Sequence, residues 1–437
     1  MDPILLAAIV LVASIAIGIV FSVPIAVSIG LGSFFAAVVL LDFEKAALVS
    51  AQRLFTGINS FTLLAIPFFV LAGVLMNTGG IAGRLIDFAK VLVGKLPASL
   101  PTTNVVANGM FGAVSGAAVA AAAAIGTVMT PRMKEEGYDK SWSAAVNVAS
   151  APAGMLIPPS NTFIVYSLVS GASVGALFMA GIIPGLIWAV ACIIVVMLTY
   201  RKFGNPQPGQ WVTLKEGLWV FWRAVPSLLM IIIVIGGIVA GIFTATESSA
   251  IAVVYCLVLG FVYRTIKVSD LPKALLDAAR TTAIIMLLVG VSTALSFVMS
   301  FSHIPDAVSD LLLGISDSPA VILAVMMVIL LLVGTFMDPT PAILIFTPIF
   351  LPVVVGFGMD PVHFGTVIVY ALCVGVITPP VGNVLFVGAR VAGMGIEPVV
   401  GKLIWFLLAL ALGLLLVAYI APFSMWIPEQ MGLLSPE

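Results

Sequence analysis

Two stretches of the sequence place a pair of prolines among apolar residues: GMLIPPSNTF at 154–163 and GVITPPVGNVLF at 375–386. A proline inside a helix removes a backbone hydrogen bond and clashes with the preceding turn, at a cost of about 3 kcal/mol. The freed backbone groups cost more again in hydrocarbon. A packed kink would explain one isolated proline. A Pro-Pro pair that occurs twice in similar surroundings instead predicts two interrupted helices whose backbone binds a ligand.

The two sides of each break offer different chemistry. The half-helix that ends near Ile157 or Thr378 leaves carbonyl oxygens without amide partners, and such oxygens suit a hard cation such as Na+. The half-helix that begins after each proline pair presents free N–H groups and the positive end of its dipole, which favours a carboxylate. We therefore expect a cation and an organic anion side by side, with these residues binding the anion: Asn161, Thr162, Gly382 and Asn383.

Two further interruptions, GAVSGA at 112–117 and FMDPTP at 336–341, lie within long apolar segments. In the first, Ser115 and Gly116 permit close approach of a backbone. In the second, Asp338 is flanked by LLLVGTF and by ILIFTPIF, and a carboxylate at membrane depth is a functional hypothesis by default. We interpret Asp338 as a cation ligand, to which Thr340 adds a hydroxyl oxygen. An Asp that caps a helix in a turn is the alternative.

The composition requires membrane helices to position these residues. The chain has 437 residues, of which 62% are hydrophobic and 8% are charged, and its mean hydropathy is +1.26. These values predict an all-α polytopic protein of the inner-membrane type, surrounded by lipid, with a retained first span. The long apolar runs exclude an outer-membrane barrel, and no soluble basic domain is present to bind nucleic acid. Cysteines at 192, 256 and 373 lack metal-site spacing and carry no expected chemistry.

Ordinary membrane spans are predicted at 4–21, 25–41, 61–77, 176–200, 224–243, 245–263, 282–300 and 403–421. Two amphipathic stretches, 42–55 and 269–280, suit helices that lie along the membrane interface. Four regions do not resemble single spans. These are 101–130 and 319–351, each with a central interruption, and 143–172 and 361–391, which contain the Pro-Pro pairs.

The positions of the Lys and Arg residues predict how these regions enter the membrane. Positive charge in short loops stays cytoplasmic, and sixteen of the eighteen Lys and Arg residues fall on one side if the N-terminus is outside; Lys45 and Arg53 are the exceptions. This distribution requires 101–130 to enter and leave on the cytoplasmic side and 319–351 on the outer side. Both regions are therefore predicted to be re-entrant hairpins of two half-crossings.

The sequence also repeats itself at an offset of 221 residues. Gly137 aligns with Gly358, Asp139 with Asp360, and each Pro-Pro pair with the other. An odd number of crossings separates the two copies, which predicts inverted repeats, as in alternating-access transporters. We expect scaffold or arm helices at 1–60 and 201–281, and transport halves at 61–200 and 282–437.

Other polar residues receive structural interpretations. Glu247 in FTATESS is expected to cap a helix, and Asn147 is expected to hydrogen-bond within the bundle. His303 and His363 are assigned to outer loops and expected to be solvated. Arg280 and Arg390 are expected to snorkel to the cytoplasmic face, with contact to an exiting anion as the alternative.

Taken together, GMLIPPSN, FMDPTP, VITPPVGN and the paired hairpins resemble the large membrane subunit of tripartite ATP-independent periplasmic (TRAP) transporters across essentially the whole chain. The resemblance implies an elevator-type carrier, not an enzyme, that uses a Na+ gradient to take up carboxylates such as C4-dicarboxylates or sialic acid. It implies no tightly bound cofactor and two partners, a separate small four-helix membrane subunit and a periplasmic substrate-binding protein. One Na+ site would contain Ser115, Gly116, Pro158, Ser160 and Asn161; the other would contain Asp338, Thr340, Thr378, Gly382 and Asn383.

Two alternatives belong to other classes. An intramembrane enzyme could use Asp338, but no second intramembrane acid or nucleophile-base pair is evident in the sequence, and two equivalent breaks are unneeded for catalysis. An ion channel could use re-entrant loops, but a selectivity filter usually needs symmetric subunits around one pore. Which carboxylate is carried does not follow from the sequence; sialic acid is the one we favour.

Overall fold

The computed structural model describes residues 3–21, 23–204 and 213–434, and within these ranges all regular secondary structure is helical. The first part of the chain forms α1 (Pro3–Val20), α2 (Ile25–Leu41), α3 (Phe43–Ile58), η1 (Thr62–Leu64), α4 (Ala65–Thr78), α5 (Ile81–Val93), α6 (Ser99–Ser115), α7 (Ala118–Glu135), α8 (Lys140–Ser150), α9 (Ala153–Leu156), α10 (Asn161–Ser170) and α11 (Val174–Phe203). The second part forms α12 (Leu214–Val239), α13 (Ala245–Val262), η2 (Val268–Asp270), α14 (Leu271–Phe301), α15 (Ile304–Ile315), α16 (Pro319–Phe336), α17 (Pro339–Gly356), α18 (Pro361–Gly375), α19 (Asn383–Val391), α20 (Glu397–Tyr419) and α21 (Pro422–Gln430). The all-α prediction is confirmed.

Seven helical stretches of the described residues are long and apolar enough to cross a membrane. An eighth results if α3 and the helix that follows it, which meet at a bend of 63°, are counted as one span. The predicted spans at 176–200 and 282–300 lie within such helices, and those at 224–243, 245–263 and 403–421 coincide with such helices except for one to four residues at the C-terminal end. The helices at 3–20 and 25–41 are apolar but shorter.

The helices recur at the offset that the sequence predicts. The elements from α6 to α8 and from α16 to α18 begin at equivalent positions, about 221 residues apart. The alignment extends to local chemistry. The Asp139 carboxylate accepts a hydrogen bond from the Trp142 amide at 2.8 Å at the start of α8, and that of Asp360 accepts one from the Val362 amide at 2.6 Å at the start of α18.

Two expectations about helix boundaries and loops are wrong. Residues 269–280 do not form a separate interfacial helix, because they continue into the next span as part of the 31-residue α14. His363 is not a solvated loop residue. It lies in the first turn of α18, is 6% exposed, and one ring nitrogen is 2.9 Å from the carbonyl oxygen of Val417 on α20. Glu247 does cap α13, in a reciprocal arrangement with Thr244.

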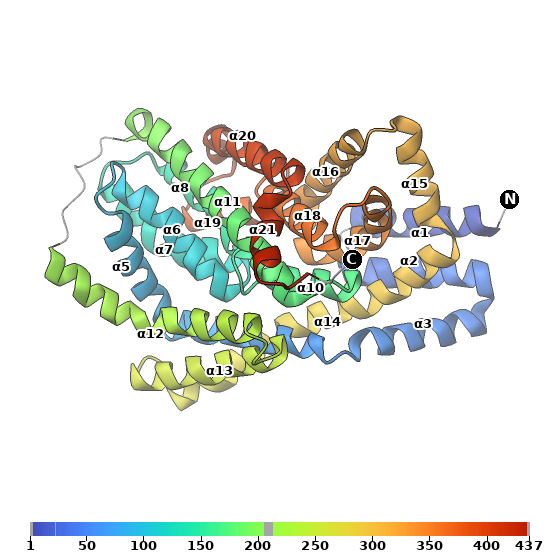
Figure 1. The fold of residues 1–437 in the computed structure, drawn as a ribbon, viewed down its shortest axis with the longest axis horizontal. Coiled ribbons are helices and arrows are strands. Elements are labelled where there is room, and N and C mark those ends of the chain that lie inside the picture. Colours follow the sequence, from blue (N-terminus) through green and yellow to red (C-terminus); the bar gives the residue numbers. More distant parts are fainter. Residues whose placement is uncertain (1–2, 22, 205–212, 435–437) are drawn as a thin grey trace.

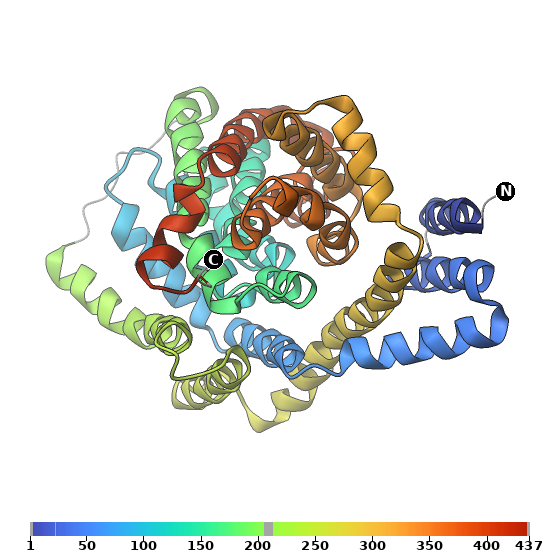
Figure 2. The same ribbon diagram turned by 45° about the vertical axis from the view of Figure 1, so that its right-hand side comes forward.

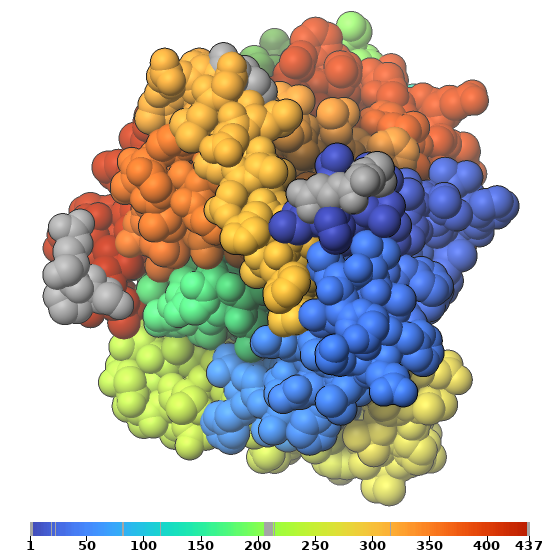
Figure 3. Space-filling model, turned by 90° about the vertical axis from the view of Figure 1, so that its right-hand side faces the viewer, coloured from blue at the N-terminus to red at the C-terminus, as the bar shows by residue number. Residues whose placement is uncertain are grey.

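The helices fall into two groups. In Figures 1 and 2, α3, α12, α13 and α14 lie along one edge of the molecule, while the hairpins and the broken helices are gathered on the other side. Helix α14 packs on α2, α3 and α4 from the first part of the chain. Figure 3 shows α1–α3, in blue, beside the yellow and orange chain around α15. Helix α4 joins these edge helices, because it packs on both α13 and α14.

Within the second group, each hairpin packs on the broken helix of its own repeat by close backbone contact. A Cβ atom placed on Gly154 of α9 would lie 2.1 Å from the Cα of Gly112 on α6. In the other repeat, a Cβ on Gly375 of α18 would lie 2.5 Å from the Cα of Gly334 on α16. Such glycine contacts let membrane helices approach closely enough for dispersion forces to hold them together.

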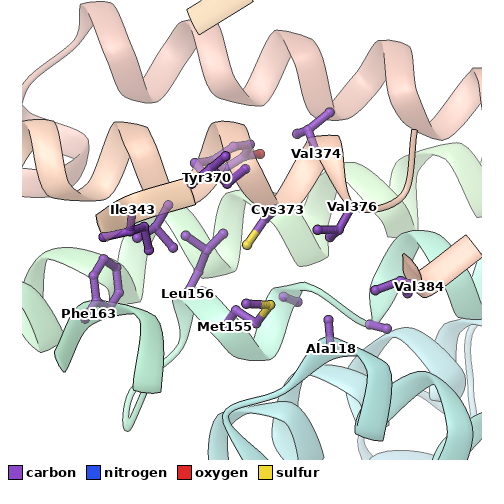
Figure 4. Close-up of a cluster of buried hydrophobic side chains, with 14 of the residues drawn as sticks. Ala118, Met155, Leu156, Phe163, Ile343, Tyr370, Cys373, Val374, Val376 and Val384 are labelled. Carbon is purple, nitrogen blue, oxygen red and sulfur yellow. The ribbon is translucent and has the colours of Figure 1, made fainter. Parts of the chain in front are cut away.

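The two breaks also face a shared apolar core. Figure 4 shows Met155 and Leu156 from the first break, and Cys373 and Val376 from around the second, in one cluster of buried side chains. Leu156, Cys373 and Val376 are at most 1% exposed. Close packing of this kind fixes the two breaks relative to each other.

Candidate substrate and cation site

Both predicted discontinuous helices are present. In the first, α8 ends at Ser150, one turn forms α9, and α10 begins at Asn161. In the second, α18 ends at Gly375 and α19 begins at Asn383. Each break contains a cis peptide bond between its two prolines. Each therefore leaves a new helix N-terminus inside the bundle, as the sequence predicted.

Two helical hairpins, α6–α7 and α16–α17, turn at the predicted interruptions; that they are re-entrant stays a prediction, and α16 and α17 are each long and apolar enough to cross a membrane. The turn between α6 and α7 falls at Gly116 and Ala117, and the turn between α16 and α17 falls at Met337 and Asp338. Gly116 has a φ of +63°, which a residue with a side chain rarely adopts. The side of the membrane on which each hairpin opens stays a prediction.

Each hairpin tip contacts the broken helix of its own repeat. A Cβ atom on Gly116 would lie 2.6 Å from the side-chain nitrogen of Asn161, so glycine is required for this contact. At the second tip, the amide of Gly382 donates to the carbonyl of Thr335 at 2.8 Å. The side chain of Asn383 interacts with the carboxylate of Asp338. Asp338 is the N-cap residue of α17, yet among the described residues its side chain accepts no capping hydrogen bond.

A cavity of about 730 Å³ lies where the tips, the breaks and the supporting helices meet. The first hairpin contributes residues 115–120, the second contributes 338–341, and the breaks contribute residues on both sides of the interruptions. Helices α2, α4 and α14 contribute the rest of the lining. The volume of the cavity is within the ~300–1,000 Å³ range typical of small-molecule sites.

Most of the predicted site residues line this cavity, namely Ser115, Gly116, Asn161, Thr162, Asp338, Thr340 and Asn383. Four predicted site residues do not line the cavity. These are Pro158, Ser160, Thr378 and Gly382, which lie within the breaks. The hydroxyls of Ser160 and Thr162 both donate to the carbonyl of Met155, in the latter case at 3.2 Å. The hydroxyl of Thr378 donates to the carbonyl of Val374 at 2.7 Å. These hydroxyl groups therefore take up backbone carbonyls that the breaks release.

Helices α4 and α14 contribute polar residues that the sequence motifs do not indicate. Asn77, Asp277 and Thr281 line the cavity, so it contains a second acid besides Asp338. The sequence does hold a signal for α14, because Asp277, Thr281, Ile284 and Leu288 share one helical face by their spacing. A separate interfacial helix at 269–280 would divide this face, whereas the continuous α14 keeps it together.

Behind the cavity, a buried polar cluster joins the first hairpin to its broken helix. The side-chain amide of Asn108 on α6 donates to the side-chain oxygen of Asn147 at 3.0 Å and to the hydroxyl of Ser150 at 2.8 Å, both on α8. Asn104 also donates to Ser150, at 3.2 Å. Asn147 in turn donates to the carbonyl of Ala122 on α7 at 2.8 Å. The structural role predicted for Asn147 is thus confirmed.

Residues 12–423 match the family described as the tripartite ATP-independent periplasmic transporter, DctM component. The chain belongs to this family. It is 49% identical to the uncharacterized protein YgiK of Salmonella typhimurium, over 96% of this chain and 97% of that protein. It is 38% identical to the C4-dicarboxylate TRAP transporter large permease protein DctM of Rhodobacter capsulatus (94% and 96% covered) and 36% identical to the sialic acid large permease SiaM of Vibrio cholerae (92% and 94%).

Among solved structures, the crystal structure of the Alcanivorax borkumensis YdaH transporter has a similar fold, with a TM-score of 0.63 and 14% identity, over 89% of this chain and 90% of that one. The chain is thus a TRAP large membrane subunit, a multi-pass protein of a bacterial inner membrane. Its family consists of transporter permeases, which rules out the alternative of an intramembrane enzyme. Family membership assigns it to secondary transport of carboxylates together with a binding protein, rather than to a channel.

Proposed function

We propose that this subunit couples the entry of Na+ to the uptake of an organic carboxylate by an elevator motion. The observation that carries the proposal is the single cavity bounded by both hairpin tips, both helix breaks and the supporting helices. Such a cavity gives a cation and an anion a shared site between two groups of helices that can move relative to one another.

The acidic tip of the second hairpin supports a cation role. Asp338 has no basic neighbour among the residues that line the cavity, all of which lie in the described part of the chain. An unpaired carboxylate among apolar helices is costly. Bound Na+ would remove that cost, with Thr340 and backbone carbonyls of the second break completing an oxygen shell. Ser115, Gly116 and the first break would form the equivalent site in the other repeat.

The helix starts support an anion role. Asn161 and Asn383 are the first residues of α10 and α19, and both line the cavity. Free N–H groups and the dipole at each N-terminus favour a carboxylate. Asn161, Thr162 and Asn383 are therefore the proposed substrate-binding residues, whereas Gly382, whose amide donates to Thr335, would position Asn383.

The apolar lining that α2, α4 and α14 contribute supports the proposal of an elevator motion. Residues such as Ile25, Val70, Ile284 and Leu288 present an apolar surface there, from α2, α4 and α14. Apolar side chains make contacts without fixed hydrogen-bond geometry, so one group of helices can slide against the other. The residues of the hairpins and breaks would then travel together with cation and cargo.

Family membership supports two partners, a small four-helix membrane subunit and a periplasmic binding protein, in keeping with the tripartite family description. Relatives are named for C4-dicarboxylate and sialic acid, so a carboxylate is the proposed class of cargo. The test is uptake into proteoliposomes that contain both membrane subunits, with the binding protein outside. We expect accumulation of a carboxylate when Na+ is high outside and none when choline replaces Na+. Equal uptake driven by a pH gradient alone would contradict Na+ coupling.

A further inference from the structure

The cavity carries one carboxylate on each of the two groups of helices that enclose it. Asp338 lies at the tip of the second hairpin, and Asp277 lies on α14 among the supporting helices. The lining residues, all within the described ranges, include no Lys, Arg or His. An organic anion that enters this cavity therefore meets two fixed negative charges and no positive side chain.

Asp277 is not neutralised by a neighbouring base. It is half-buried, and no Lys or Arg among residues 3–21, 23–204 and 213–434 lies within 4 Å of its carboxylate. Lys273 and Arg280, on the same helix, are exposed. The face that Asp277 shares with Thr281 continues as Ile284 and Leu288. This face of α14 therefore offers one charge, one hydroxyl and otherwise apolar surface.

One carboxylate can still bind in these surroundings. The N-termini of α10 and α19 supply partial positive charge and free N–H groups, and a bound cation would offset Asp338. A second carboxylate on the same cargo would then meet the remaining polar lining, which consists of Asn77, Asp277 and Thr281. Like charges at close quarters in a partly desolvated site strongly oppose binding. Hydroxyl groups, in contrast, can donate hydrogen bonds to Asp277 and exchange them with Asn77, Thr281 and Thr340.

We propose that Asp277 is a specificity-determining residue that restricts the cargo to hydroxylated monocarboxylates, such as sugar acids, and rejects dicarboxylates. The inference rests on the proposed function, because it assumes that a carboxylate binds at the two helix starts. It deepens that function by placing the hydroxylated end of the cargo beside Asp277 on α14. The cavity volume of about 730 Å³ leaves room for a cargo of this kind.

The test is direct binding to the purified complex of the two membrane subunits, without the binding protein, so that selection by that protein does not enter. The unfolding midpoint is measured in Na+ at constant ionic strength while gluconate, N-acetylneuraminate or succinate is titrated. We expect at least one of the two monocarboxylates to reach its half-maximal shift at an approximately tenfold lower concentration than succinate. Asp277→Asn should reduce this ratio about tenfold, because the repulsive charge is removed.

Two variants complete the design. Asp277→Glu keeps the charge and should keep the preference for monocarboxylates. Asp310→Asn removes an acid from α15 that does not line the cavity, and should leave the ratio unchanged. The inference is overturned if succinate binds the parent complex as tightly as the monocarboxylates do, or if Asp277→Asn leaves the ratio unchanged. If no carboxylate shifts the midpoint at any Na+ concentration, the proposed carboxylate site fails and the inference fails with it.

Discussion

Asp139, Asp338 and Asp360 each stand at the N-cap position of a helix, but the carboxylate of Asp338 does not cap its helix. Asp139 and Asp360 accept hydrogen bonds from the first turns of their helices. Asp338 occupies the same N-cap position on α17, but its carboxylate lines the cavity and, among the described residues, accepts no such bond. Capping therefore does not explain why an acid stands at this tip.

We expect Asp338→Asn to raise the Na+ concentration for half-maximal transport by about tenfold or more, because Asn keeps the shape and one oxygen but removes the charge that attracts the cation. The measurement is the Na+ dependence of uptake in proteoliposomes, with membrane insertion and subunit assembly checked in parallel. Asn and Asp cap helices about equally well. An unchanged Na+ curve would therefore favour a capping role and exclude a charge role.

At the scale of elements, the two hairpins are held to their broken helices by different forces. The first uses the buried cluster of Asn104, Asn108, Asn147 and Ser150. The three asparagines correspond, 221 residues later, to Val325, Ile329 and Ile368. The second hairpin therefore relies on apolar contact at the equivalent surface, although both hairpins share the close glycine contact.

We expect Asn108→Ala to destabilise the complex by about 1–2 kcal/mol, because buried interhelical hydrogen bonds of Asn147 and Ser150 lose their partner. The thermal unfolding midpoint of the purified complex measures the loss. Asn108→Leu is the matched variant, since it restores most of the volume without the hydrogen bonds. If Leu at this position recovers parental stability, volume rather than hydrogen bonding explains the cluster.

The hairpins should open to opposite sides of the membrane. A cysteine at Lys95, an exposed position between α5 and α6, should react with an impermeant reagent only from the cytoplasm, and one at Ser316, before α16, only from the periplasm. The native cysteines are buried and should give little background. Reaction of both introduced cysteines from the same side would end the inverted-repeat prediction and, with it, the assignment of the domain halves.

At the scale of the whole molecule, the cavity is lined by helices brought together from the entire chain: α2, α4 and α14, the two hairpins and the two breaks. The described helices form membrane spans and their connections. We therefore assign the capture of dilute cargo to the periplasmic binding protein. This division predicts a strong kinetic dependence on that partner.

We expect proteoliposomes with both membrane subunits and an inward Na+ gradient to take up free carboxylate at least about tenfold more slowly without the binding protein than with it. The reason is that capture and presentation of cargo would then be missing. Initial uptake rates at equal cargo concentration, with a binding protein of another specificity as control, give the comparison. Full-rate uptake from free cargo would show that this subunit does not need delivery.

The sequence by itself determined the features that depend on neighbouring residues. Pro-Pro pairs interrupt helices wherever they stand, because proline cannot continue the hydrogen-bond pattern, so both breaks were predicted at the right residues. The repeat aligns Asp139 with Asp360, whose capping role the structure adds, and capping by Glu247 follows from the sequence. Their partners lie two or three residues away, within reach of local reasoning.

Tertiary structure alone decided which of these residues face one another. His363 is buried because α20 packs over it, more than fifty residues away. Asp277 faces the cavity because α14 packs against α2, α3, α4 and α17, and these contacts select which side of the helix lines the cavity. Periodicity identifies the faces of a helix, but only packing against distant segments assigns one of them to lipid, one to the core and one to the site.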